Sequence, residues 1–239
     1  MVSGFFINGG LKMGKYTKLL WDVDETLLDF TAAENNGVQA VLRAYGVEPD
    51  AEKIACYSRI NDSLWKACER GEITRDHILE SRFPLFFKEL GVEGDGLAAE
   101  RLYRKQLDES AVLIDGALEI LERLSGHYEM YVITNGVSKT QYSRLKKSGI
   151  DRYMKDIFVS EDAGAQKPQN AFFDYCLERM GHPALEQLLV IGDSLTSDIQ
   201  GGINAGIDTC WFDRKGTGDT QGREVTYIIR ALKELEEIL

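Results

Sequence analysis

Short apolar runs alternate with amphipathic stretches along most of the chain. The runs have the length and the β-branched and aromatic content of buried strands, and they fall at residues 17–23, 128–133, 157–160, 188–193, 209–212 and 225–229. Helical periodicity is found between them, at residues 116–125, 138–148, 169–181 and 197–205. Because strands that alternate with helices form parallel sheets covered on both faces, the pattern predicts an α/β fold with a doubly wound parallel sheet.

Residues 31–110 interrupt this rhythm, because they contain no clear strand. Apolar residues recur there at helical spacing, which predicts roughly four helices. Thr31, with Glu34 three residues later, predicts a capping box at the start of the first helix. We therefore expect a bundle of helices, residues 31–110, that is inserted as a cap into a core formed by residues 16–30 and 111–239.

The aromatic residues of this insert have two interpretations. Their helical spacing favours a role in the core of the bundle, and the alternative is that one of them stacks on a bound base; they are Trp65, Phe83, Phe86 and Phe87. Arg75 and Arg82 likewise have two interpretations, as solvated side chains or as side chains that face a ligand.

Composition narrows the cellular setting and the class of partner. The net charge of -11 disfavours a nucleic-acid polymer as partner, whereas a small anionic substrate would need a local cation. The sequence contains no run of about 18 apolar residues, so we expect no membrane span. The Gly-rich residues 1–15, read as a loose extension, do not resemble a secretory signal. With four scattered cysteines and no CxxC pair, we expect a cytoplasmic protein. For the oligomeric state, a monomer and a homodimer both stay open.

Polar side chains stand at the ends of four consecutive predicted strands. A lone aspartate at a strand end is more often a turn former than a functional group. Ligands of a doubly wound sheet, however, bind beyond the carboxyl ends of its strands. The combination therefore favours a site made of Asp22, Asp24, Thr134, Asn135, Lys167, Asp193 and Asp198.

The aspartates of this set suit metal and proton chemistry. Asp22, Asp193 and Asp198 would form a carboxylate cluster that needs a cation, and hard oxygen ligands without His or Cys favour Mg²⁺. Asp22 and Asp24 are two residues apart, so both can face one site. One carboxylate could attack a phosphorus atom while the other transfers protons.

The remaining members suit the binding of a phosphate. The hydroxyl of Thr134 and the amides around Asn135 could hold phosphate oxygens, and Lys167 is a mobile positive charge fit for the same task. A phosphate dianion, Mg²⁺ and the lysine together would balance the clustered aspartates.

Four segments resemble, in order, the four motifs of the haloacid dehalogenase superfamily: WDVDETLLD, VITNG, QKP and IGDSLTSD. The segment between the first two resembles the helical cap of the C1 class. The resemblance covers nearly the whole chain past residue 15 and implies a Rossmann-like core with an inserted cap. Trp21 is one departure, because the family more often has Phe there.

The resemblance also implies a role for each site residue. Asp22 would be the nucleophile and form an aspartyl-phosphate, and Asp24 would be the general acid and base. The phosphoryl group would be held by Thr134, Asn135 and Lys167. The Mg²⁺ ligands would be Asp22, the backbone carbonyl of Asp24, Asp193 and, directly or through Lys167 or water, Asp198.

Longer stretches, including TNGVSKTQYSRLKKSGI and IGDSLTSDIQGGINAGIDTCWF, resemble the pyrimidine 5′-nucleotidases that act on non-standard nucleotides. They imply a nucleoside 5′-monophosphate as substrate, with pyrimidines preferred. A phosphatase for another small metabolite, such as a sugar phosphate, stays open, as does a non-catalytic binding protein with the same fold. The glycines of GGINAG do not follow the dinucleotide-binding pattern and are interpreted as close helix–sheet packing.

Overall fold

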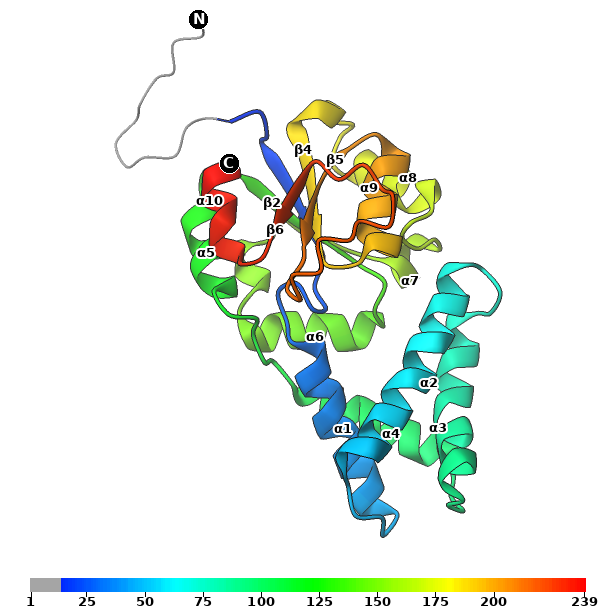
Figure 1. The fold of residues 1–239 in the computed structure, drawn as a ribbon. Helices are drawn as coiled ribbons and strands as arrows, with labels where there is room; N and C mark the ends of the chain where they lie inside the picture. The colour runs from blue at the N-terminus through cyan, green and yellow to red at the C-terminus, as the bar shows by residue number, and fades with distance from the viewer. Residues whose placement is uncertain (1–13) are drawn as a thin grey trace, which may run out of the picture. The chain divides into compact units, whose positions relative to one another are not determined.

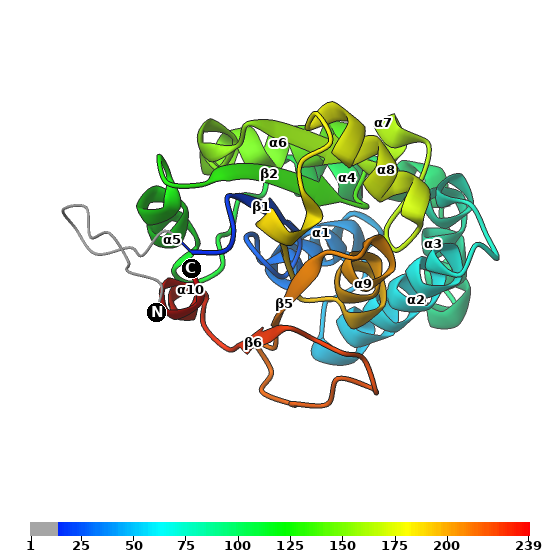
Figure 2. The same cartoon turned by 90° about the horizontal axis from the view of Figure 1, so that it is seen from above.

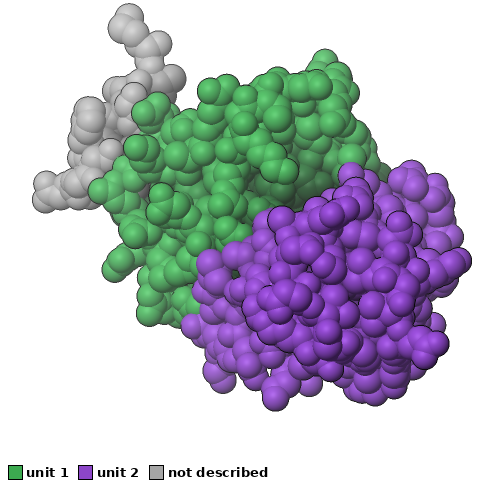
Figure 3. All heavy atoms as spheres, turned by 60° about the horizontal axis from the view of Figure 1, so that its bottom comes forward, with its two compact units in different colours: residues 1–29, 113–138, 148–239 green, residues 30–112, 139–147 purple. Residues whose placement is uncertain are grey.

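The computed structural model describes residues 14–239, so nearly all of the predicted N-terminal extension lies outside the described residues. The chain divides into two compact units, which Figure 3 draws in green and purple. Among the described residues, the first, here the α/β unit, comprises 14–29, Leu113–Ser138 and Ser148–Leu239. The second, here the helical unit, comprises Phe30–Val112 and Lys139–Lys147.

The α/β unit is built on one parallel sheet of six strands in the order β3-β2-β1-β4-β5-β6 (Figure 1). The strands are β1 Lys18–Trp21, β2 Glu129–Thr134, β3 Asp156–Val159, β4 Leu188–Gly192, β5 Asp208–Phe212 and β6 Tyr227–Ile229. The predicted doubly wound α/β fold is confirmed. Since the strand order reverses at β1, the carboxyl ends of β1, β2 and β4 meet at the switch point where such sheets bind ligands.

Helices cover both faces of this sheet. Figures 1 and 2 show α5 and α10 on one side, and α8 and α9 on the other. These helices span Ala117–Leu124, Leu235–Ile238, Asn170–Arg179 and Gln200–Ala205, and α7 is the short Ser160–Ala163. Every residue of β4 is buried, as expected for a strand covered on both faces. Close packing of the GGINAG glycines is confirmed at Gly202, where a Cβ would lie 2.4 Å from Cγ2 of Thr209 in β5.

The helical unit contains α1 Phe30–Ala44, α2 Ala51–Glu69, α3 Arg75–Leu90 and α4 Gly96–Glu109, and it also takes Lys139–Lys147 from α6, Ser138–Ser148. Its core is aromatic: Tyr57 and Tyr103 pack against Phe83, and Phe86 and Phe87 join them. The prediction of a core role is therefore confirmed for the three phenylalanines.

Two predictions for the helical unit need correction. Trp65 is half-buried and lies outside the aromatic core. The capping box of Thr31 and Glu34 is wrong, because α1 begins at Phe30 and Thr31 lies inside the helix. The carboxylate of Glu34 instead turns inward and accepts hydrogen bonds from Ser58 Oγ at 2.5 Å and Asn61 Nδ2 at 2.8 Å.

Arg82 neither faces solvent nor stands open to a ligand. Its guanidinium is buried and donates two hydrogen bonds, of 2.7 and 2.6 Å, to the carboxylate of Glu100. It also donates to Asn61 Oδ1 at 3.1 Å and stacks on the ring of Tyr103.

Over residues 14–239, no helix is long and apolar enough to cross a bilayer.

Candidate active site

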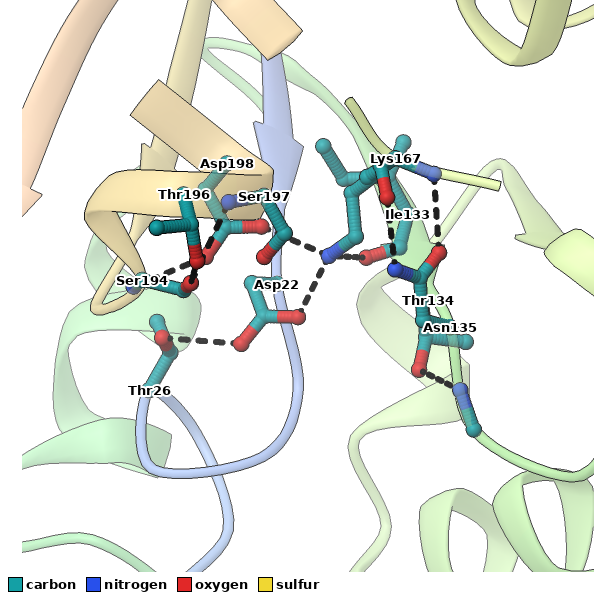
Figure 4. A network of polar contacts seen from close by, with 11 residues as sticks. Asp22, Thr26, Ile133, Thr134, Asn135, Lys167, Ser194, Thr196, Ser197 and Asp198 are labelled. Carbon is teal, nitrogen blue, oxygen red and sulfur yellow. Dashed lines mark hydrogen bonds and ion pairs between the residues drawn. The ribbon is translucent and has the colours of Figure 1, made fainter. Parts of the chain in front are cut away.

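Asp22 directly follows β1 and is fixed to the neighbouring strand. Its backbone N–H donates to the carbonyl of Ile191 in β4 at 2.9 Å, which extends the sheet ladder by one residue. Its carboxylate is 6% exposed and accepts from Lys167 Nζ at 2.7 Å through Oδ1 and from Thr26 Oγ1 at 3.1 Å through Oδ2 (Figure 4). The sheet thus holds one carboxylate rigidly at the switch point.

Lys167 is buried with its ammonium group between carboxylates. Nζ donates to Asp22 Oδ1 at 2.7 Å, to Asp198 Oδ1 at 2.6 Å and to the carbonyl of Ile133 at 2.9 Å. Three donated bonds use all three protons of an ammonium. Burial by itself lowers the pKa of Lys167, but the charges of Asp198 and Asp22 outweigh it and raise the pKa above its usual value. The lysine therefore stays charged at neutral pH.

The side-chain amide of Asn135 holds the main chain of Lys167. Asn135 Nδ2 donates to the carbonyl of Lys167 at 2.9 Å, and the N–H of Lys167 donates to Asn135 Oδ1, also at 2.9 Å (Figure 4). Thr134, the last residue of β2, is buried, and its Oγ1 accepts from the N–H of Gly136 at 3.1 Å. Both polar atoms of the Asn135 side chain bond to the main chain of Lys167. The group of Asn135 that could bind a phosphate is therefore its backbone N–H.

Three carboxylates converge beside this lysine. Oxygens of Asp22, Asp193 and Asp198 lie within 4.8 Å of one another. Burial, with Asp198 nearby, raises the pKa of Asp22 to about 7, and burial, with Asp22 nearby, raises the pKa of Asp193 well above its usual value. Such shifts indicate that these carboxylates are costly to ionise without a cation. An all-oxygen donor set of this kind fits Mg²⁺.

A π-helical turn, Leu195–Ile199, carries Asp198 to this position. The turn begins at Ser194, whose N–H donates to Asp198 Oδ2 at 3.1 Å. A Cβ at Gly192, the last residue of β4, would lie 2.3 Å from the same oxygen, so the carboxylate can approach the strand only at a glycine. Turns of this π type are frequent at functional sites.

Asp24 lies in a tight turn, residues 23–29, between β1 and α1. The N–H groups of Leu27 and Leu28 donate to the carbonyl of Val23, and the N–H of Glu25 donates to the carbonyl of Leu28 at 2.8 Å. Asp24 is half-buried, and its carboxylate is not part of the converging group. Its two assigned roles, a backbone ligand and an acid–base group, remain predictions.

Three supporting side chains were missed among the predicted site residues. Thr26 bonds to Asp22, and Ser194 begins the turn of Asp198. Trp211 of β5 donates from Nε1 to the carbonyl of Asp193 at 2.8 Å. Thr26 lies within the segment WDVDETLLD, whose resemblance to a family motif was a signal for it, whereas nothing near Trp211 in the sequence indicates a contact with a residue 18 positions away.

Known proteins resemble this chain over almost its whole length. A profile described as haloacid dehalogenase-like hydrolase matches residues 19–212. YfnB of Bacillus subtilis is 44% identical over 227 residues, 95% of this chain and 97% of the relative. Two proteins named pyrimidine 5′-nucleotidase follow, PynA of Streptococcus pneumoniae with 35% identity and YjjG of Escherichia coli with 34%. The alignments cover 94% of this chain and 95% and 98% of those relatives.

Solved structures agree with this comparison. A crystal structure of YfnB bound to magnesium has a TM-score of 0.89 at 45% identity, and the match covers 94% of this chain and 98% of that one. A dehalogenase structure has a TM-score of 0.74 at 19% identity, which shows a shared fold alone.

Proposed function

Because the chain belongs to the haloacid dehalogenase-like hydrolase family, we propose that it is a Mg²⁺-dependent phosphohydrolase that dephosphorylates nucleoside 5′-monophosphates, pyrimidines before others. The predicted family, and with it an enzyme, is confirmed. The observation that carries the finer proposal is the buried contact of Asp22 with Lys167 beside two further carboxylates. The nucleotidase names of two relatives support the substrate class.

In the first step a carboxylate oxygen of Asp22 attacks the phosphorus atom of the substrate. The bond between phosphorus and the ester oxygen breaks, and Asp24 donates a proton to the departing alkoxide. Asp22 must be ionised for this step. A Mg²⁺ ion held by Asp22, Asp193 and the backbone carbonyl of Asp24, and by Asp198 directly or through Lys167 or water, would supply the positive charge that favours the ionised form.

In the second step Asp24, now a carboxylate, removes a proton from a water molecule whose oxygen attacks the phosphorus. The bond between phosphorus and Asp22 breaks, inorganic phosphate leaves, and both aspartates return to their starting states. Lys167 supplies fixed positive charge to the phosphoryl oxygens in both steps, and the hydroxyl of Thr134 and the N–H of Asn135 hold the same oxygens. The Asn135 side chain contributes by fixing the main chain of Lys167.

A screen of phosphate release with Mg²⁺, ranked by kcat/KM, tests the proposal. The panel holds uridine, thymidine and purine nucleoside monophosphates with hexose and glycolytic phosphates, and Asp22→Asn is the inactive control. We expect pyrimidine nucleotides to rank first. A sugar phosphate that ranks above every nucleotide would replace the nucleotidase with a general metabolite phosphatase. Release from no member of the panel would reject both of these substrate classes.

A further inference from the structure

Arg214 connects two strand-end loops of the α/β unit. It follows β5 by two residues, and its guanidinium reaches the turn of residues 23–29 that follows β1. Nη1 donates to Glu25 Oε2 at 3.1 Å and Nη2 donates to Asp29 Oδ2, also at 3.1 Å. Glu25 directly follows Asp24, and Asp29 ends the same turn, so one side chain holds the turn at two places.

The turn needs support at Glu25. The φ angle of Glu25 is +61°, in the left-handed region that residues with a Cβ seldom adopt. Such a conformation persists only where the surroundings hold it. The bond from its N–H to the carbonyl of Leu28 holds the backbone, and the ion pair with Arg214 holds the side chain. Asp24 precedes Glu25 directly, so the backbone of Asp24 leads into this position.

The loop that carries Arg214 is itself well fixed. The adjacent Asp213 is 3% exposed, and its N–H donates to the carbonyl of Ile229 in β6 at 2.8 Å. Its carboxylate accepts from the N–H of Gly218 at 2.7 Å and from Thr217 Oγ1 at 3.3 Å. Arg214 therefore projects from a hydrogen-bonded turn that is anchored to the sheet, and its ion pairs can restrain the turn of residues 23–29.

We propose that Arg214 is a positioning residue, which holds the turn of residues 23–29 so that the carboxyl group of Asp24 is kept in place for proton transfer. The inference rests on the proposed function, in which Asp24 protonates the leaving group. A planar guanidinium can bond to two carboxylates at once through separate nitrogens, which a lysine ammonium does less well. Arg214 does not itself touch the reacting atoms.

Kinetics with two leaving groups separate positioning from general structural support. In Arg214→Gln, kcat/KM for a nucleoside monophosphate, which reports the steps up to release of the leaving group, should fall roughly 10-fold or more, a part of the 10²–10⁴ that acid–base catalysis contributes. The kcat/KM for p-nitrophenyl phosphate, whose leaving group needs no proton, should change much less. Arg214→Lys keeps the charge but not the contact with two carboxylates through separate nitrogens. Its activity on the nucleoside monophosphate should lie between those of the parent protein and Arg214→Gln.

Arg223→Gln is the matched control, because it removes the same charge from the same loop. Arg223 bonds to the side-chain amides of Gln200 and Gln221 and not to the Asp24 turn. We expect both substrates to be hydrolysed by this variant as by the parent protein.

Amide hydrogen exchange tests the contact without any turnover. In Arg214→Gln, amides of residues 23–29 should exchange about 2- to 30-fold faster, as expected for the loss of two partly exposed ion pairs, and those of Arg223→Gln should not. Equal loss of kcat/KM on both substrates, or unchanged exchange, would overturn the inference. If the parent protein hydrolyses neither substrate with Mg²⁺, the proposed function fails, and the catalytic part of the inference fails with it. Exchange then still decides whether Arg214 holds the turn.

Discussion

At the scale of single residues, the buried ammonium of Lys167 explains why aspartates can cluster beside a hydrophobic strand. Its bonds to Asp22 and Asp198 supply one positive charge within the cluster. A second cation would favour the ionised forms of Asp22 and Asp193, since burial and neighbouring carboxylates raise the pKa of both. The same residues that would destabilise an ordinary core thus form a cluster of carboxylates that could hold a metal ion.

The proton-transfer role of Asp24 leads to a prediction with a chemical signature. Asp24→Asn should lower kcat/KM, which reports the steps up to release of the leaving group, by roughly 10²–10⁴ with a nucleoside monophosphate, because the amide cannot carry the proton. The loss should be smaller with p-nitrophenyl phosphate, and Mg²⁺ should still bind, since the backbone carbonyl remains. Steady-state kinetics with both substrates provide the measurement. Equal losses would argue against the general acid.

Sequence reasoning found the charged residues of the site but not the side chains that support them. Asp22, Lys167, Asp193 and Asp198 could be predicted because parallel strands end at one edge of a sheet. Arg214 could not, because it meets Glu25 across 189 positions of the chain, between two loops with no shared pattern.

At the scale of elements, Arg82 of α3 and Glu100 of α4 join two helices through a buried ion pair. Arg82→Met should lower the free energy of unfolding by about 3–5 kcal/mol, because Glu100 is left buried without its partner. Urea denaturation measures the loss. Combining Arg82→Met with Glu100→Leu should recover most of it, and the exposed Arg101→Met should change little. A loss for Arg82→Met no larger than that of Arg101→Met would contradict the account.

Glu129 at the start of β2 gives a pH-dependent prediction. Hydrogen bonds from Lys155 and Lys18 lower the pKa of Glu129 to about 2. A carboxyl group with a lowered pKa stabilises the folded state when the pH is above its usual pKa, and the stabilisation is lost as the pH falls through the lowered pKa. Glu129→Gln should therefore be less stable than the parent protein at neutral pH. The deficit, about 1 kcal/mol for partly exposed pairs, should shrink between roughly pH 4.5 and pH 2. Thermal unfolding across this range measures it, and a constant deficit would contradict the assignment.

Element types were easier to predict than their ends. The order of strands and helices follows from the hydrophobic period, whereas no local pattern indicated that α1 begins at Phe30 and that Glu34 turns inward to Ser58 and Asn61. The predicted helix at residues 197–205 is instead a π-helical turn followed by α9. The approach of Asp198 to Gly192 accompanies this turn, and no local propensity encodes it.

At the scale of the molecule, a net charge of -11 would repel the anionic substrate that we propose, so turnover should depend on a bound metal ion. Chelation should abolish turnover and Mg²⁺ should restore it. Mg²⁺ should also raise the thermal midpoint of the chelated protein, with a stabilisation of about 2.7 kcal/mol at 100 times its Kd. Asp193→Asn should reduce this rise, which is measured without substrate. Full activity after exhaustive chelation would contradict the metal assignment.

The central claim is that Asp22 becomes phosphorylated during turnover, and trapping the intermediate tests it most directly. Asp24→Asn should slow the second step more than the first when p-nitrophenyl phosphate is the substrate, because only the second step then needs a proton acceptor. Rapid mixing of Asp24→Asn with p-nitrophenyl phosphate and Mg²⁺ should give a burst of about one p-nitrophenolate per enzyme. The reaction is then quenched with acid, and the digested protein is analysed by mass spectrometry. The peptide that contains Asp22 should carry one phosphoryl group. Release of p-nitrophenolate without a phosphorylated peptide, or with the phosphoryl group on another residue, would contradict the account.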